Sequence, residues 1–118
     1  MIKIHKFLKS VPYAYEGIKT LLKLENNAKI HLLAVFVVTV TGFIIHFSEG
    51  EWLAVIIVMG GVLALEAVNT AIEIVVDLVS PEFHPLAKKV KDVAAGAVLL
   101  FVLAALTVTG VILWSHFG

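Results

Sequence analysis

The sequence predicts an all-α integral membrane protein in which an amphipathic N-terminal surface helix precedes three transmembrane helices. Hydrophobic residues make up 60% of the 118 residues and the mean hydropathy is +1.02, which is too apolar for an ordinary soluble domain. Three apolar runs follow one another, each able to cross a bilayer core of about 30 Å as a helix. The length allows one domain, residues 1–118. The absence of Cys excludes a disulfide framework and thiolate chemistry.

Residues 1–29 are predicted to form the surface helix. Apolar residues recur there at helical steps, at Phe7, Leu8, Val11, Tyr15, Ile18 and Leu22. Lysines are scattered around the rest of the helix, and their stems can reach anionic headgroups. Pro12 is expected to bend this helix or to divide it in two. The alternative is a soluble helix packed on a partner domain, which is disfavoured because the sequence contains no other soluble domain.

The transmembrane helices are predicted at residues 30–47, 52–79 and 92–114. The first carries only His31 and His46 as ionisable groups, near its ends, where both are expected to be interfacial rather than ligands. The second exceeds the roughly 20 residues needed to cross a bilayer, so its last turns should protrude.

The connections between the spans are predicted to be short and polar. Residues 48–51 read as a solvated turn, and residues 80–91 as a loop whose two prolines prevent one continuous helix. Within the second span, Gly60 and Gly61 are expected to permit close helix packing, or alternatively to provide a flexible point.

Lysine placement predicts the orientation. All nine basic residues are Lys, and they lie either before the first span or between the second and the third. The positive-inside rule therefore places the N-terminus and the 80–91 loop in the cytoplasm and the C-terminus outside. Trp52 and Trp114 then both mark the outer interface, where indole rings are enriched.

A polar stripe interrupts the second span. Glu66, Asn69, Thr70, Glu73 and Asp77 lie within about 60° of one line down a helix. Carboxylates on a lipid-soluble helix are costly, so the stripe needs a cation, a metal or another subunit as its partner. The alternative is a buried seam that only fixes helix packing, although such seams usually contain Ser, Thr or Asn.

The chemistry of this stripe points to phosphate transfer at a membrane surface. Glu25, Lys91 and Asp92 are expected at the same depth as the stripe. Carboxylates and an amide suit Mg²⁺, and nearby lysines suit a polyphosphate. A deeper carboxylate can serve as a general base. The pattern therefore favours a reaction between a water-soluble phosphate donor and a lipid hydroxyl, without a P-loop or a kinase-type Gly loop.

A non-catalytic protein of a different class, either an ion path or an assembly scaffold, is the other candidate. A path should carry ionisable groups across the full thickness of the membrane, and the sequence has none between Trp52 and Leu65. The acidic groups enter from one side only, which favours a site over a path.

Two long motifs closely resemble the bacterial diacylglycerol kinase and undecaprenol kinase family. They are Glu-Ala-Val-Asn-Thr-Ala-Ile-Glu-Ile-Val-Val-Asp at 66–77 and His-Pro-Leu-Ala-Lys-Lys-Val-Lys-Asp-Val-Ala-Ala-Gly-Ala-Val at 84–98. The resemblance implies a homotrimer in the bacterial inner membrane, with cytoplasmic active sites shared between subunits, and no nucleic-acid partner. It also implies phosphorylation of a lipid alcohol by Mg-ATP, with undecaprenol as the expected acceptor and diacylglycerol as the alternative.

The resemblance also implies roles for individual residues. Glu66 matches the general base, and Glu25 and Glu73 match the pair that holds Mg²⁺. Contacts with ATP are expected from Lys6, Tyr13, Glu25, Glu73, Asp77, Glu82, Phe83, His84, Lys91 and Asp92. Contacts with the lipid are expected from Lys6, Glu66, Asn69, Ala95 and Trp52. Lys6 occupies a position where better-known diacylglycerol kinases carry Arg, whose bidentate contact Lys cannot reproduce.

Overall fold

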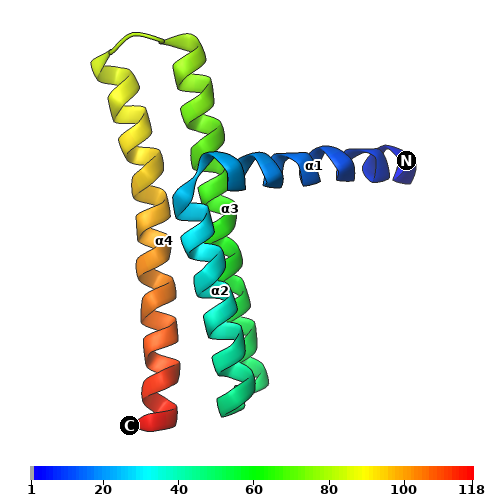
Figure 1. The fold of residues 1–118 in the computed structure, drawn as a ribbon, viewed down its shortest axis with the longest axis vertical. Helices are drawn as coiled ribbons and strands as arrows, with labels where there is room; N and C mark the ends of the chain where they lie inside the picture. Colours follow the sequence, from blue (N-terminus) through cyan, green and yellow to red (C-terminus); the bar gives the residue numbers. More distant parts are fainter. Residues whose placement is uncertain (1) are drawn as a thin grey trace.

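The computed structural model describes residues 2–118 and contains four α-helices in that range. They are α1 (Ile4–Leu24), α2 (Asn26–Ile45), α3 (Glu49–Val79) and α4 (Pro85–Phe117). Helices α2, α3 and α4 lie side by side, whereas α1 turns away from the start of α2 and points outward from the bundle (Figure 1). The three bundled helices are long and apolar enough to cross a membrane, so the all-α fold is confirmed, and each predicted span overlaps one of these helices.

The corner between α1 and α2 contains a single non-helical residue. Glu25 is extended, with φ −117° and ψ 114°, and it ends α1 and begins α2. Helix α1 continues through Pro12, so the predicted division into two helices is wrong. Proline removes the donor to the carbonyl of Leu8, and both residues are exposed, so solvent can satisfy that carbonyl.

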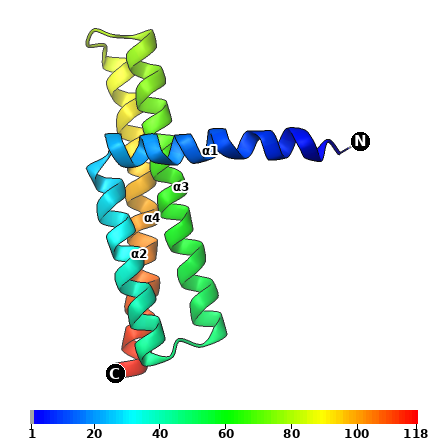
Figure 2. The same ribbon diagram turned by 45° about the vertical axis from the view of Figure 1, so that its right-hand side comes forward.

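Helix α1 crosses the middle of α3 rather than its end (Figure 2). A groove of about 390 Å³ lies between them, lined by Ala14, Gly17, Ile18, Thr20 and Leu21 of α1 and by Ala67, Thr70, Ala71 and Ile74 of α3. Beyond this crossing, the last turns of α3 and the first turns of α4 extend together to their connecting loop.

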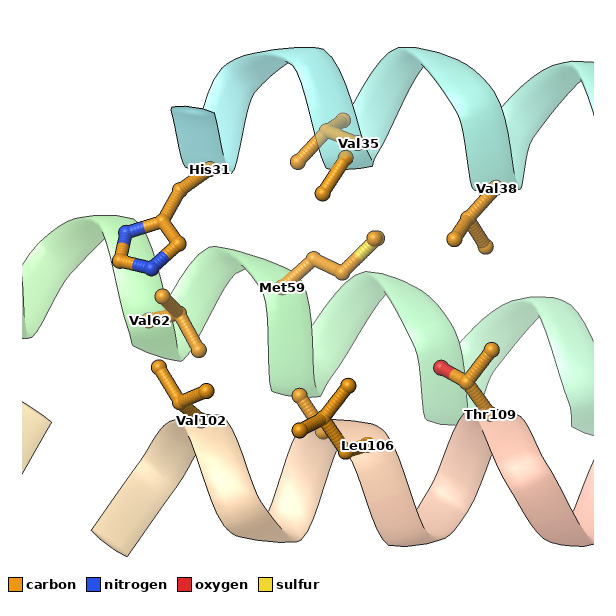
Figure 3. A pocket seen from close by; sticks show the side chains of 10 residues that line it. His31, Val35, Val38, Met59, Val62, Val102, Leu106 and Thr109 are labelled. Atoms are coloured by element: carbon orange, nitrogen blue, oxygen red, sulfur yellow. The ribbon is translucent and has the colours of Figure 1, made fainter. Parts of the chain in front are cut away.

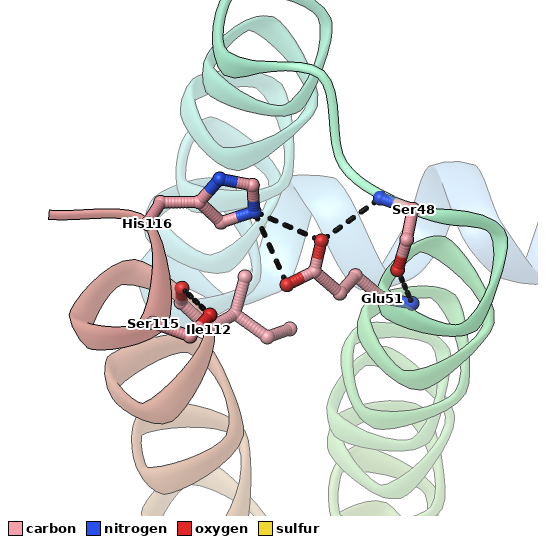
Figure 4. A network of polar contacts seen from close by, with 5 residues as sticks. All are labelled: Ser48, Glu51, Ile112, Ser115 and His116. Atoms are coloured by element: carbon pink, nitrogen blue, oxygen red, sulfur yellow. Dashed lines mark hydrogen bonds and ion pairs between the residues drawn. The ribbon is translucent and has the colours of Figure 1, made fainter.

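A polar network fastens the α2–α3 turn to the end of α4 (Figure 4). The Ser48 hydroxyl accepts a hydrogen bond from the Glu51 N–H at 3.2 Å, and the Glu51 carboxylate accepts one from the Ser48 N–H at 2.8 Å. This capping box satisfies donors at the start of α3. His116 Nε2 lies 2.9 Å from Glu51 Oε1. Glu51 is therefore a structural partner of α4 rather than a residue of a solvated turn.

The opposite connection is shorter than the sequence predicts. Helix α4 begins at Pro85 instead of after Lys91, because proline is compatible with the first position of a helix. The Nδ1 atom of His84 accepts the Leu86 N–H at 3.1 Å and caps this start. The residues from Pro85 to Lys91 thus place their side chains at helical spacing, which the loop prediction did not anticipate.

Close packing between α3 and α4 depends on Gly61. A Cβ atom at Gly61 would lie 2.2 Å from the Phe101 ring, whereas a Cβ at Gly60 would meet nothing within 4 Å among the described residues. The packing role is confirmed for Gly61, and Gly60 makes no such contact within this chain.

Replacing Gly61 with Ala is expected to lower the free energy of unfolding by about 1–3 kcal/mol, since the Phe101 ring must move. Replacing the neighbouring Gly60 with Ala is the matched control. It should be neutral or slightly stabilising, because Ala has the higher helix propensity by about 1 kcal/mol. Unfolding in mixed micelles by increasing SDS measures both. Equal effects of the two changes would contradict the assigned contact.

Candidate active site

The deepest carboxylate of the stripe is paired across the α2–α3 interface. Glu66 of α3 is only 2% exposed. Its Oε2 atom lies 2.8 Å from Nδ1 of His31 on α2. The approach is an ion-pair distance without the direction of a hydrogen bond, so both atoms keep unused hydrogen-bonding capacity within the described chain. The sequence interpretation of His31 as an interfacial residue missed this contact.

The next turn of the stripe is buried and incompletely paired. The side-chain N–H of Asn69 donates to Glu73 Oε1 at 3.2 Å. The Asn69 Oδ1 and Thr70 Oγ1 atoms are buried with no hydrogen-bond partner among residues 2–118. Each such buried orphan costs about 1–3 kcal/mol. These two atoms therefore keep unused hydrogen-bonding capacity within the described chain.

A second polar region surrounds the α3–α4 connection. Lys91 Nζ bonds to Asp77 across the two helices, and Lys88 Nζ bonds to Asp92 at 2.6 Å. An open groove of about 350 Å³ lies there. Six of the residues predicted to contact ATP line it: Asp77, Glu82, Phe83, His84, Lys91 and Asp92. Along α3, Asp77 and Glu66 are separated by about 16 Å at 1.5 Å per residue, so this groove and the buried pair are neighbouring parts of one helix face.

Two of the predicted nucleotide residues lie apart from this region within a single chain. Lys6 is near the free end of α1, about 28 Å along that helix from Glu25 (Figure 1). Tyr13 is on the same helix and is 79% exposed. Glu25 itself is partly buried at the α1–α2 corner. No group of three or more His, Asp or Glu side chains that could hold a metal occurs in the described part of the chain.

The two remaining residues predicted to contact the lipid are Ala95 and Trp52. Ala95 is exposed on α4, next to the buried Ala94. Trp52 is about 21 Å along α3 from Glu66. Its ring packs 5.0 Å from the Phe43 ring and 5.2 Å from the Phe47 ring, measured between centroids. Trp52 therefore sits at the opposite end of the bundle from Glu66.

An apolar groove begins beside the buried pair (Figure 3). It has a volume of about 150 Å³ and runs between α2, α3 and α4. Its lining is His31, Ala34, Val35, Val38, Met59, Val62, Val102, Ala105, Leu106 and Thr109. His31 is the residue at the end of this groove that also touches Glu66.

Comparison with known proteins identifies relatives over most of the chain. A profile of the family described as prokaryotic diacylglycerol kinase matches residues 12–113. The chain is similar to an undecaprenol kinase of Bacillus subtilis, with 41% identity over 99 residues that cover 84% of this chain and 80% of that protein. It is also similar to a diacylglycerol kinase of Synechocystis sp., with 37% identity over 107 residues that cover 90% and 61%. A diacylglycerol kinase of Escherichia coli K12 is 42% identical over 57 residues, which cover 48% and 47%.

Proposed function

The chain belongs to the prokaryotic diacylglycerol kinase family and is a membrane lipid kinase, and from this premise we propose that it transfers the γ-phosphate of ATP to undecaprenol. Similarity to an undecaprenol kinase extends over most of both proteins, whereas the diacylglycerol kinases match at lower identity or over a shorter stretch. Diacylglycerol is the second candidate acceptor, favoured by the match to the Escherichia coli enzyme.

The observation that carries the kinase mechanism is the buried carboxylate of Glu66, which is 2% exposed. In the proposed reaction, the lipid hydroxyl oxygen forms a bond to the γ-phosphorus of ATP. The bond between that phosphorus and the β–γ bridging oxygen breaks, and ADP leaves. The hydroxyl proton passes to the Glu66 carboxylate. A general base in such a position typically contributes about 10² to 10⁴-fold to the rate.

The residues next to Glu66 fit a Mg²⁺ ion bound with ATP. Glu73 already accepts from Asn69, and Asn69 Oδ1 is a buried oxygen with no partner in the described chain. Carboxylate and amide oxygens are the donors that Mg²⁺ prefers, with water and phosphate oxygens in its other positions. We assign Glu25 and Glu73 as the carboxylates that would hold it. The ion, when bound, neutralises charge on the phosphates.

We assign the α3–α4 groove to the nucleotide and the Glu66 level to the lipid hydroxyl. Lys91 and the other residues of that groove would hold the nucleotide, and Asn69 would orient the acceptor beside the base. Lys6 and Tyr13 are far along α1, so their proposed contacts with ATP need a neighbouring subunit or a movement of α1. Trp52 would contact the distal part of a long lipid chain. Ala95, which is exposed on α4, would also contact the lipid.

A homotrimer completes this proposal. The orphaned Asn69 and Thr70 atoms and the exposed apolar side chains of α2, α3 and α4 support further contacts outside the single chain. The distance from Glu49 to Thr70 along α3 is about 32 Å, close to the bilayer core of about 30 Å. An α1 that crosses at Thr70 therefore fits a surface position, with its exposed apolar residues in the membrane.

Lysine placement supports an inner-membrane orientation with the active site in the cytoplasm. A reporter enzyme that is active only outside the cytoplasm should be active when it is fused after Gly118. A reporter at that position that proves to be cytoplasmic would refute the orientation.

The test of the function is phosphorylation of undecaprenol and diacylglycerol, side by side, in mixed micelles with Mg-ATP. The proposal expects lipid-dependent ATP consumption and a higher kcat/KM for undecaprenol. Preference for diacylglycerol would select the second candidate. Absence of ATP consumption with either lipid would refute the lipid-kinase mechanism and favour a non-catalytic scaffold.

A further inference from the structure

The contact between Glu66 and His31 has a consequence for the rate of the reaction. We propose that His31 is a positioning residue that holds the Glu66 carboxylate in the orientation needed to take the acceptor's proton, an inference that rests on the function proposed above. The His31 ring reaches Glu66 from α2, a helix that contributes no other residue to the proposed chemistry.

The ring lies at the interface between α2 and α3. Ala28, three residues earlier on α2, is completely buried, and Val62, four residues before Glu66 on α3, is 6% exposed. These spacings put Ala28 on the same face of α2 as His31, and Val62 on the same face of α3 as Glu66. Val62 and His31 line the same groove wall, and the ring points from α2 toward α3 (Figure 3). The ring is thus partly buried, with 22% of its side chain exposed, at the end of a groove between the two helices.

Among residues 2–118, Glu66 has no other polar partner that would fix its carboxylate. The next amide on its own helix face, Asn69, donates to Glu73 instead. Of the two carboxylate oxygens, Oε2 is the one that faces His31 and is fully enclosed. Holding Oε2 leaves Oε1 to receive the proton. Without His31, the flexible Glu side chain would sample several rotamers, and misplacement by about 1 Å can cost about 10²-fold in rate.

The position of the interacting atom allows a sharp test. The contact uses Nδ1, which is one bond beyond Cγ. The side-chain nitrogen of Asn also lies one bond beyond Cγ, whereas that of Gln lies one bond further out, near the position of Nε2. His31→Asn should therefore retain most of kcat. His31→Gln and His31→Leu should lower kcat by about 10²-fold, with the KM values for ATP and lipid little changed.

The matched control is His46, the residue directly after the end of α2. It is exposed at the far end of the helix and has a left-handed backbone, with φ 61°. Asn tolerates that conformation, so His46→Asn should leave both kcat and KM unchanged. Unfolding by SDS and the oligomeric state should be measured for every variant.

A double-mutant cycle separates positioning from a role in packing alone. If His31 acts through Glu66, His31→Leu should have no further effect on kcat in a Glu66→Gln background. A loss that remains in that background would overturn the inference. So would equal activities of His31→Asn and His31→Leu, because a positioned nitrogen would then be irrelevant.

Failure of this inference is distinguishable from failure of the proposed function. Wild-type protein that phosphorylates undecaprenol, together with a Glu66→Gln variant that does not, supports the function whatever His31 does. Full activity of all His31 variants in that situation would refute the positioning role alone. A wild-type protein without lipid-dependent turnover would refute both.

Discussion

Replacing Glu66 with Gln is expected to lower the kcat of lipid phosphorylation by at least about 10²-fold. Gln keeps the size of the side chain and an oxygen near His31, but it cannot take the proton of the acceptor hydroxyl. ATP binding and oligomer assembly should therefore change little. Glu66→Asp should fall between the two, because the shorter side chain withdraws the carboxylate by one methylene. Steady-state kinetics with saturating lipid measure the effect.

The matched control for this change is Glu49→Gln. Glu49 is an exposed carboxylate at the start of the same helix, and the structure gives it no ion pair, so its replacement should leave kcat unaltered. Near-normal turnover in Glu66→Gln would remove Glu66 as the base and make Asp92 the next candidate. Loss of activity through failure to assemble would instead support a packing role for the polar stripe.

Replacing Glu73 or Glu25 with Gln is expected to raise the Mg²⁺ concentration needed for half-maximal activity at least about 10-fold. Each change removes one negative charge from the proposed metal site, and hard divalent cations depend strongly on carboxylate ligands. Titration of Mg²⁺ at fixed ATP measures the requirement.

Glu16→Gln supplies the control for the metal titration. Glu16 is an exposed acidic residue of α1 that pairs with Lys19 at 3.8 Å. Its replacement should not change the Mg²⁺ requirement. If Glu25→Gln and Glu73→Gln both behaved like this control, the assignment of the two carboxylates to the metal would be untenable.

The architecture is largely predictable from the sequence, because apolar runs of this length have few alternatives to spanning helices. The end of the second span is an example: its surplus turns do extend past the crossing with α1. The start of α4 was harder to predict from the sequence, because a proline can either end a helix or begin one, and the neighbouring residues decide which.

The polar stripe was predictable because all its members lie on one helix, where spacing alone determines the face. The pairing of His31 with Glu66 was not, since it depends on the register between α2 and α3. That register depends on the corner at Glu25 and on the packing of the buried Ala28. The spacing of residues within a single helix cannot predict either of them. The same reasoning applies to His116 and Glu51, which are 65 residues apart.

The single-residue corner at Glu25 also gives α1 a mechanical role. With only one non-helical residue between the two helices, α1 changes its angle chiefly through the backbone torsions of Glu25. Helix α1 is thus a lever arm about 30 Å long, and its fulcrum is a proposed metal ligand. A small tilt of the arm would turn the carboxylate, so we expect bending stress in the bilayer to be transmitted to the proposed site. Comparing the Mg²⁺ requirement in flat and strongly curved vesicles would measure this transmission.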